Sequence, residues 1–502
     1  MPIIAGMDSR LEPVLGVAGI RALEKAAHGA PLMARAGAAA AEVAAAMLAT
    51  RSGTIVVLAG PGNNGGDGFV VAARLAAAFH DVAVVFRDDA KKLPADAAAA
   101  WQAFTATGAT TRRDPPAGEP ALVVDALFGI GIARPLAARH AELVAWANAC
   151  GAPILALDVP TGLDADTGIA VAPAIRADAT ATFIALKPGL LTAAGPELAG
   201  ALTVHRLDVA IDAAHAEGHR LDWPAIASRL PDVLHRRARN AHKGTFGTLA
   251  IIGGAEGMQG APLLAARAAM RLGAGKVVVG FASSDHPGVD LTAPELMLRD
   301  AEAALTGADA LVVGPGLGQS EAARALVARA IAAPAPLVLD ADALNLVAAD
   351  AALRAALRSR HAPRVLTPHP AEAARLRGTD VAGIQRDRCA AARALAHELG
   401  AHVVIKGSGS VLAHPDGRYD INATGNPALA TAGTGDVLAG MVGALLAQRI
   451  DAADALRIGV CAHGAAADAL VARGIGPLGV SATAFADAAR DLVNAAGRAA
   501  SA

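Results

Sequence analysis

The chain has 502 residues, a formal net charge of −2, and 54% hydrophobic but only 3% aromatic residues. The length predicts two or three domains, and the lack of any block of like charges argues against nucleic acid or an anionic membrane as a partner. Three widely separated cysteines, and apolar runs that break before the ~20 residues of a membrane span, predict a cytoplasmic protein without disulfides, membrane helices or a signal peptide.

Short β-branched runs alternate with Ala-rich helical stretches along the whole chain. Continuous apolar strands alternating with helices predict parallel sheets covered on both faces, so we expect an α/β chain with one three-layer αβα domain in each half. The predicted strands are Thr54–Ala59, Val82–Phe86, Leu122–Asp125, Ile154–Val159, Ala179–Phe183 and Ala201–Val204 in the first half, and Thr248–Ile252, Lys276–Gly280, Ala310–Val313, Leu337–Leu339, Val365–Thr367 and Val403–Ile405 in the second.

The boundary between the halves is expected within Asp212–Trp223, which lacks a strand pattern. We assign residues 1–212 to the first domain, 213–223 to a linker and 224–502 to the second domain. His215 and His219 have a spacing that zinc sites use, but no further ligands cluster nearby. A solvated linker is therefore the favoured interpretation.

The loop after the first predicted strand reads GPGNNGGDGF, Gly60–Phe69. Its glycines match the G-x-G-x-x-G pattern of a dinucleotide-binding turn, but Asn63, Asn64 and Asp67 are polar groups that such a turn does not require. No Lys-Ser/Thr pair follows, which excludes a Walker A loop.

Two other strand ends of the first half are also polar. One ends in Asp125, and another carries Asp158 with Thr161 shortly after it. Carboxylate, amide and hydroxyl oxygens suit a hard cation, and with Asn64 these groups would meet at one sheet edge. Each residue alone is equally consistent with a simple loop or helix cap.

Together with LMARAGAAAAE, the segments GPGNNGGDGF, VDALFGIGIARP and ALDVPTGLDADTG resemble the NAD(P)H-hydrate epimerase domain. The resemblance implies a Rossmann-like domain in which Asn64, Asp125 and Thr161 bind potassium and Asp158 is catalytic. The role of Lys187 stays open. The implied substrate contacts are Asn63, Asn64, Gly65, Gly66, Asp67, Gly129, Ile130, Gly131, Ile132, Ala133, Arg134, Pro135 and Asp158.

In the second half, the segment Thr431–Gly440, TAGTGDVLAG, is the most informative. Glycines at a helix start let backbone N–H groups face an anion, and the helix dipole favours negative charge there. Asp436 at the same place is suited to taking a proton from a hydroxyl beside a phosphate, although it could also be a simple cap. KGSGS, Lys406–Ser410, supplies donors and a cation for nucleotide phosphates, and nearby Asp and Glu residues could hold Mg²⁺.

The ordered set HKGxxG, GMxGA, GPGLG, LDADALN, LTPHPxE, KGxxS and GNPxLATxGTGDVLAG resembles the ADP-dependent NAD(P)H-hydrate dehydratase of the ribokinase-like superfamily. The resemblance implies a ribokinase-like domain that uses ADP. The implied substrate contacts are Ala261, Gly318, His369 and Asp436, with Asp436 as the catalytic base. The implied nucleotide contacts are Lys406, Gly407, Ser408, Gly409, Ser410 and Gly435.

The two resemblances imply the same substrate, hydrated NADH or NADPH, and therefore a bifunctional repair enzyme. We also expect a homo-oligomer. Three alternatives stay open at this point. The first is a nicotinamide-dependent oxidoreductase built on the Gly60–Phe69 loop. The second is a small-molecule kinase with a regulatory first half. The third makes the first half a non-catalytic module for oligomerisation.

Overall fold

The computed structural model describes residues 11–48, 51–132, 135–171, 173–211 and 217–499. The chain divides into two compact units, Glu12–Gly218 and the part from His219 onward. Each unit has its own sheet, so the predicted α/β class with one sheet in each half is confirmed.

The first unit contains one parallel sheet with the strand order β4-β3-β2-β5-β6-β7-β8. The strands are β2 (Ile55–Ala59), β3 (Val82–Phe86), β4 (Thr111–Arg112), β5 (Leu122–Ala126), β6 (Ile154–Leu157), β7 (Ala179–Phe183) and β8 (Ala201–His205), preceded by the short β1 (Glu12–Val14). The helices are α1 (Val17–Ala26), α2 (Leu32–Leu48), α3 (Asn63–Ala77), α4 (Ala95–Ala106), α5 (Ala138–Ala149), α6 (Pro188–Leu191) and α7 (Gly195–Leu198).

Strands β2, β5, β6 and β7 are buried along their whole length because helices cover both faces of the sheet. Helices α2, α3 and α4 form a core with one face, and α5 forms a second core with the other. The chain order changes direction between β2 and β5, which lie side by side. Ligands bind in such sheets outside the carboxyl ends of the strands at this switch point.

The second unit has a larger mixed sheet with the order β9-β18-β17-β16-β15-β14-β13-β10-β11-β12. The strands are β9 (Gly218–Leu221), β10 (Thr248–Gly253), β11 (Lys276–Phe281), β12 (Met297–Asp300), β13 (Ala310–Val313), β14 (Leu337–Leu339), β15 (Arg364–Leu366), β16 (His402–Ile405), β17 (Val411–Ala413) and β18 (Tyr419–Asn422). The helices are α8 (Trp223–Ala227), α9 (Asp232–His235), α10 (Gly260–Arg271), α11 (Ala301–Ala304), α12 (Glu321–Ala332), α13 (Ala341–Ala349), α14 (Ala351–Ser359), α15 (Pro370–Arg377), α16 (Val381–Arg386), α17 (Arg388–Leu399), α18 (Thr434–Ala447), α19 (Ala452–Ala472) and α20 (Ala482–Ala499).

The strands β10 to β16 pair in parallel. Strand β17 pairs antiparallel with both β16 and β18, which the sequence analysis did not expect. The reason is the length of the link Lys406–Ser410 between β16 and β17. A parallel connection needs a crossover of a dozen or more residues, whereas this short link can only turn back. The predicted nucleotide loop is thus a hairpin turn at one sheet edge.

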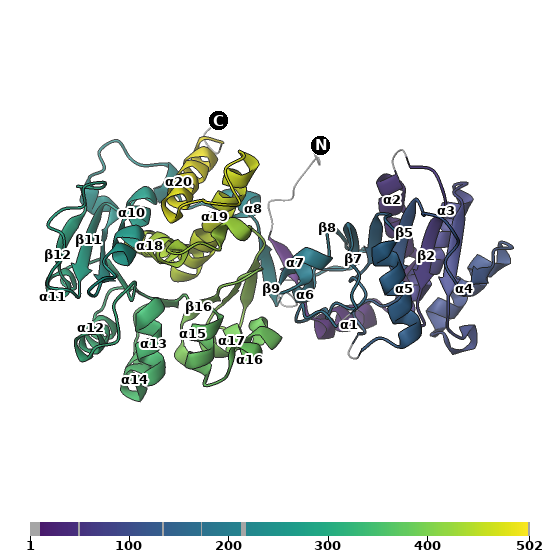
Figure 1. The fold of residues 1–502 in the computed structure, drawn as a ribbon, viewed down its shortest axis with the longest axis horizontal. Helices are drawn as coiled ribbons and strands as arrows, with labels where there is room; N and C mark the ends of the chain where they lie inside the picture. Colours follow the sequence, from purple (N-terminus) through teal and green to yellow (C-terminus); the bar gives the residue numbers. More distant parts are fainter. Residues whose placement is uncertain (1–10, 49–50, 133–134, 172, 212–216, 500–502) are drawn as a thin grey trace. The chain divides into compact units, whose positions relative to one another are not determined.

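Helices α10, α18, α19 and α20 pack together on one face of this sheet, and Figure 1 shows α12 to α15 on the other side. Of the described helices, α19 alone is long and apolar enough to cross a membrane. It is a core helix, since 72% of that stretch is buried inside the structure.

The predicted linker, residues 213–223, contains a strand that its sequence did not indicate. Strand β9 joins the second sheet beside β18, where the Ala423 amide donates to the carbonyl of Leu221 at 2.9 Å. His219 of this strand lies 3.3 Å from the carboxylate of Asp420, and His215 lies outside the described residues.

Candidate active sites

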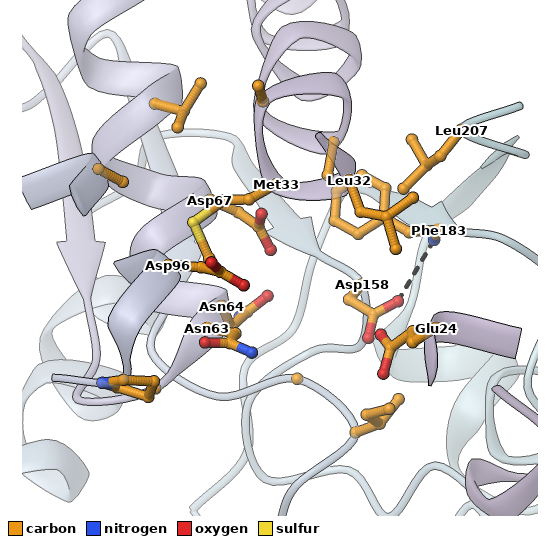
Figure 2. A pocket seen from close by; sticks show the side chains of 18 of the residues that line it. Glu24, Leu32, Met33, Asn63, Asn64, Asp67, Asp96, Asp158, Phe183 and Leu207 are labelled. Carbon is orange, nitrogen blue, oxygen red and sulfur yellow. Dashed lines mark hydrogen bonds between the residues drawn. The ribbon is translucent and has the colours of Figure 1, made fainter. Parts of the chain in front are cut away.

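The first unit has a cavity of about 880 Å³ at the switch point of its sheet. Its walls come from α1, the start of α2, the start of α3, α4 and the ends of the neighbouring strands. Figure 2 shows the polar side chains that face it. Predicted site residues that line this cavity are Asn63, Asn64, Asp67, Gly129, Ile130, Gly131 and Asp158.

Other predicted residues of the first unit lie around the cavity rather than on its wall. Gly65 and Gly66 are buried in α3, where a Cβ would overlap the carbonyl of Gly60 or the side chain of Met33. Their small size lets α3 pack closely on its own loop and on α2. Ile132 and Pro135 do not line the cavity, and Ala133 and Arg134 lie outside the described residues.

The predicted cation site brings Asp125 and Thr161 into direct contact. The Thr161 hydroxyl donates to Oδ1 of Asp125 at 2.8 Å, and its amide donates to Oδ2 at 2.8 Å. Burial raises the pKa of Asp125 to about 6, because this carboxylate has exchanged water for only a few hydrogen bonds.

Asn64 is the third member of the predicted cation site. Its amide oxygen and nitrogen are both buried, and neither has a hydrogen-bond partner among the described residues. Buried polar atoms without partners are rare because they forfeit their hydration, and they commonly mark the place of a water, ion or ligand. The orphaned amide borders Gly129, whose hypothetical Cβ would lie 3.3 Å from the Asn64 oxygen and 3.1 Å from Oδ2 of Asp158.

Asp158 follows β6 in a left-handed backbone conformation, with φ of 66°. Such a conformation costs a non-glycine residue on the order of 1 kcal/mol and is kept only where the surroundings impose it. One oxygen, Oδ1, is held by the ammonium of Lys187 and by the Phe183 amide at 3.3 Å. The carboxylate therefore has a fixed orientation at the cavity wall.

Two further residues belong to this site that the sequence analysis did not assign to it. Lys187 is fully buried, and its ammonium also donates to the Thr182 hydroxyl at 2.9 Å and to the Phe183 carbonyl at 2.8 Å. Glu24 reaches the cavity from α1. Lys187 fits the pattern of the family that the first half resembles, but its role stayed open because a lone Lys-Pro-Gly sequence more often marks a surface turn. Glu24 was not predicted, and it lies on a largely exposed helix.

In the second unit, the predicted phosphate segment begins α18. Gly433 precedes the helix in a left-handed conformation, with φ of 85°, which glycine adopts without strain. A Cβ on Gly435 would lie 3.3 Å from the ammonium of Lys406 and 3.9 Å from Oδ2 of Asp340. The helix start, the KGSGS loop and the end of β14 thus meet at one place.

Asp436 lies in the first turn of α18 within this cluster. Burial raises its pKa to about 7, with Asp340 adding to the effect and Lys406 opposing it. Lys406 lies 3.1 Å from Asp340, which also accepts a hydrogen bond from Thr367 at 2.7 Å. The opposite charges of Asp340 and Lys406 therefore offset each other. Asp436, with a pKa raised to about 7, binds and releases a proton near neutral pH.

His369 begins α15 beside this cluster. Its Nδ1 accepts from the amide of Ala371 at 3.1 Å, and its own amide donates to Glu372 at 2.8 Å. These bonds form a capping box that fixes the ring. Burial lowers the pKa of His369, with the nearby cation Lys406 adding to the effect, so the ring is neutral at physiological pH.

The remaining predicted residues of this unit come from neighbouring loops. The Gly318 amide donates to Asp342 at 2.9 Å, and in the same loop a Cβ on Gly316 would lie 3.3 Å from the side chain of Ala261. The guanidinium of Arg388 donates to the Ser408 carbonyl and thereby supports the KGSGS loop. Arg388 belongs to α17, and nothing in its local sequence indicated this contact.

The comparisons with known proteins agree for both halves. The family model described as YjeF-related protein N-terminus matches residues 29–189, and the one described as NAD(P)H-hydrate dehydratase matches residues 249–489. The bifunctional NAD(P)H-hydrate repair enzyme Nnr of Coxiella burnetii is 39% identical over 454 residues, which cover 88% of this chain and 90% of that protein. The chain belongs to the bifunctional NAD(P)H-hydrate repair enzyme family.

Other members and relatives of this family are similarly close. The Escherichia coli enzyme Nnr is 40% identical, over 88% of this chain and 85% of that protein. The ADP/ATP-dependent NAD(P)H-hydrate dehydratase of Bacillus subtilis, solved with ATP and Mg²⁺, is 33% identical with a TM-score of 0.48, and covers 54% of this chain and 95% of its own. The predicted family and enzyme class are confirmed, and the oxidoreductase, kinase and non-catalytic alternatives lose their support.

Proposed function

We propose that this bifunctional repair enzyme restores hydrated NADH and NADPH in two steps. Water added across the C5–C6 double bond of the nicotinamide ring leaves a C6 hydroxyl in R or S form. The first domain, residues 1–212, interconverts the two epimers. The second domain, residues 224–502, dehydrates the S form with ADP and releases AMP and phosphate. Residues 213–223 join them.

In the second domain, Asp436 removes the proton of the C6 hydroxyl. The hydroxyl oxygen then attacks the terminal phosphorus of ADP and AMP leaves. The lone pair of the ring nitrogen next expels phosphate, and loss of a C5 proton restores the double bond. The observation that carries this proposal is the placement of a buried, proton-exchanging Asp436 at the start of α18, beside Lys406 and Gly435.

The phosphates of ADP would lie at the amide end of α18 and beside Lys406. Positive partial charge at a helix start, together with a lysine cation, stabilises the charge that develops during phosphoryl transfer. Nucleotide contacts are proposed for Lys406, Gly407, Ser408, Gly409, Ser410 and Gly435. Substrate contacts are proposed for Ala261, Gly318, His369 and Asp436.

Mg²⁺ would accompany the nucleotide. The described residues contain no group of three His, Cys, Asp or Glu side chains able to hold a metal ion, so the phosphates would supply many of its ligands. When bound, Mg²⁺ offsets phosphate charge.

Potassium fits the first domain by the chemistry of the donors. Asn64, Asp125 and Thr161 offer only oxygen ligands, and the orphaned amide oxygen of Asn64 is the buried acceptor that a cation would satisfy. When bound, potassium supplies a fixed positive charge beside the loop that would hold the substrate. Asp158 would act next to C6, with substrate contacts from the segments Asn63–Asp67 and Gly129–Pro135. Homo-oligomerisation and a cytoplasmic location stay predictions.

The Asp436→Asn variant tests the dehydratase assignment. We expect S-form dehydration to fall by roughly 100-fold or more, because a positioned base contributes that much. ADP binding, measured by calorimetry, should change little, since the phosphate contacts come from other residues. Near-normal turnover of this variant would contradict the assignment of Asp436 as the base.

A further inference from the structure

The cavity of the first unit is lined by four carboxyl groups, those of Glu24, Asp67, Asp158 and the exposed Asp96 of α4. Glu24, Asp67 and Asp158 all face it (Figure 2), and Lys187 bonds directly to Asp158. Negative charges that share a partly buried space repel one another, so a buried carboxyl group without a cation partner favours its protonated form. Lys187 supplies a cation partner to one of these groups, Asp158.

Lys187 commits its ammonium to one side of Asp158. Its three donors go to Asp158 Oδ1, the Thr182 hydroxyl and the Phe183 carbonyl, and its side chain is fully buried. The other carboxylate oxygen, Oδ2, lies toward Gly129 at the cavity. The pair thus presents one carboxylate oxygen, already oriented, to a bound substrate.

Asp67 has the opposite environment. It is buried in the first turns of α3, and no lysine or arginine of the described chain forms an ion pair with it. Burial raises the pKa of Asp67 well above its usual range, and the charges of Asp158 and Glu24 act in the same direction. In Figure 2, Asp67 lies across the cavity from Asp158 and Glu24.

We infer that the epimerase works with two carboxyl groups of divided roles, in which Asp158, held by the positioning residue Lys187, accepts the substrate proton and Asp67 is the catalytic donor. The inference rests on the proposed epimerase activity and adds to it the group that returns the proton. Glu24 differs from Asp67 because Lys187 and Arg21 partly compensate its charge.

The roles give a balanced reaction. Asp158 takes the proton of the C6 hydroxyl, the C6–N1 bond breaks, and C6 becomes an aldehyde. The electron pair moves to N1, which is conjugated with the ring carboxamide, and Asp67 protonates it. Rotation about C5–C6 and the reverse steps close the ring with the hydroxyl on the other face. Nothing is oxidised or reduced, and both carboxyl groups regain their starting state.

The test follows conversion of purified S epimer to R epimer by the full-length protein. Nucleotide is left out so that the second unit cannot dehydrate the substrate. We expect Asp67→Asn and Lys187→Met each to lower kcat by roughly 100-fold or more with little change in KM. The wild-type rate should fall as pH rises and Asp67 loses its proton, and this alkaline decline should be absent from the residual rate of Asp67→Asn. Asp67→Glu and Lys187→Arg should recover part of the loss.

Asp114→Asn, an exposed aspartate of the same unit, is the matched control and should behave as wild type. The inference is overturned by wild-type kcat in Asp67→Asn, by a change confined to KM, or by an alkaline decline that persists in Asp67→Asn. Equal losses in the Asn and Glu variants would also overturn it. If the wild-type protein itself shows no interconversion above the spontaneous rate, the proposed epimerase activity fails instead.

Discussion

Asp436, Asp340 and Lys406 share one electrostatic environment at the start of α18, and their charges cannot be considered separately. The motif predicted that Asp436 would sit at a helix start near phosphate-binding elements, and the fold places it there. The pairing of Lys406 with Asp340 could not be predicted, because 66 residues separate them. The same holds for Lys187, whose burial depends on strands that only the folded sheet brings together.

The pKa of Asp436 predicts the pH dependence of dehydration. A base acts only when ionised, and the pKa of Asp436 is raised to about 7, so kcat/KM for the S form should rise as pH increases through about 7. A pH–rate profile from pH 5 to 9 measures this. A flat profile across that range would rule out Asp436 as the titrating base.

Lys406 lowers the pKa of Asp436, so its removal should shift that profile. In Lys406→Met the acid limb should move to higher pH, because Asp340 and Glu372 are then uncompensated neighbours of Asp436. ADP binding should weaken as well. Lys276→Met, in the same unit, is the control and should leave both measurements unchanged. An unmoved acid limb in Lys406→Met would mean that the cation does not act on Asp436.

At the scale of elements, apolar runs in the sequence predicted the central parallel strands of both sheets. They did not predict a strand that contains polar residues. Every central strand lies where its β-branched run predicted. Strand β18, Tyr419–Asn422, was missed because it contains a charged residue, although it is buried. The structure explains this: Asp420 is compensated by Arg457 at 2.7 Å and His414 at 3.0 Å. Such a strand is recognisable only once its partners are known.

The close packing of α18 on α10 depends on Gly440. A Cβ there would overlap the backbone carbonyl of Ala265, and backbone cannot move aside as a side chain can. Gly440→Ala gains up to ~1 kcal/mol of helix propensity, but overpacking costs ~1–3 kcal/mol, so we expect net destabilisation. Denaturant unfolding measures it against Gly288→Ala, which meets open space and should change stability by less than ~0.5 kcal/mol. Equal stability of both variants would contradict this packing.

At the scale of the whole molecule, the chain forms two units, and each brings together the residues of one proposed site. The family, the α/β class and the division of labour were predictable from motif order alone. The parts played by Glu24 and Lys187 in the site of the first unit were not predictable, because this site is assembled from α1, α3 and the loops after β6 and β7.

Because epimerisation and dehydration are assigned to different sites, a substitution in one site should leave the other activity intact. Asp158→Ala should stop consumption of the R epimer beyond its spontaneous conversion, while S-form dehydration with ADP continues at the wild-type rate. Each pure epimer is assayed by the absorbance of the restored reduced cofactor. If the variant consumes both epimers at wild-type rates, Asp158 has no role in epimerisation.

The most direct measurement incubates the wild-type protein with a mixture of both hydrate epimers, ADP and Mg²⁺, and follows the reduced-cofactor absorbance on a timescale shorter than spontaneous epimerisation. Our account predicts complete conversion of the mixture to NADH or NADPH, with one AMP and one phosphate formed per hydrate consumed. Conversion that stops when the S epimer is exhausted, or that proceeds without ADP consumption, would contradict it.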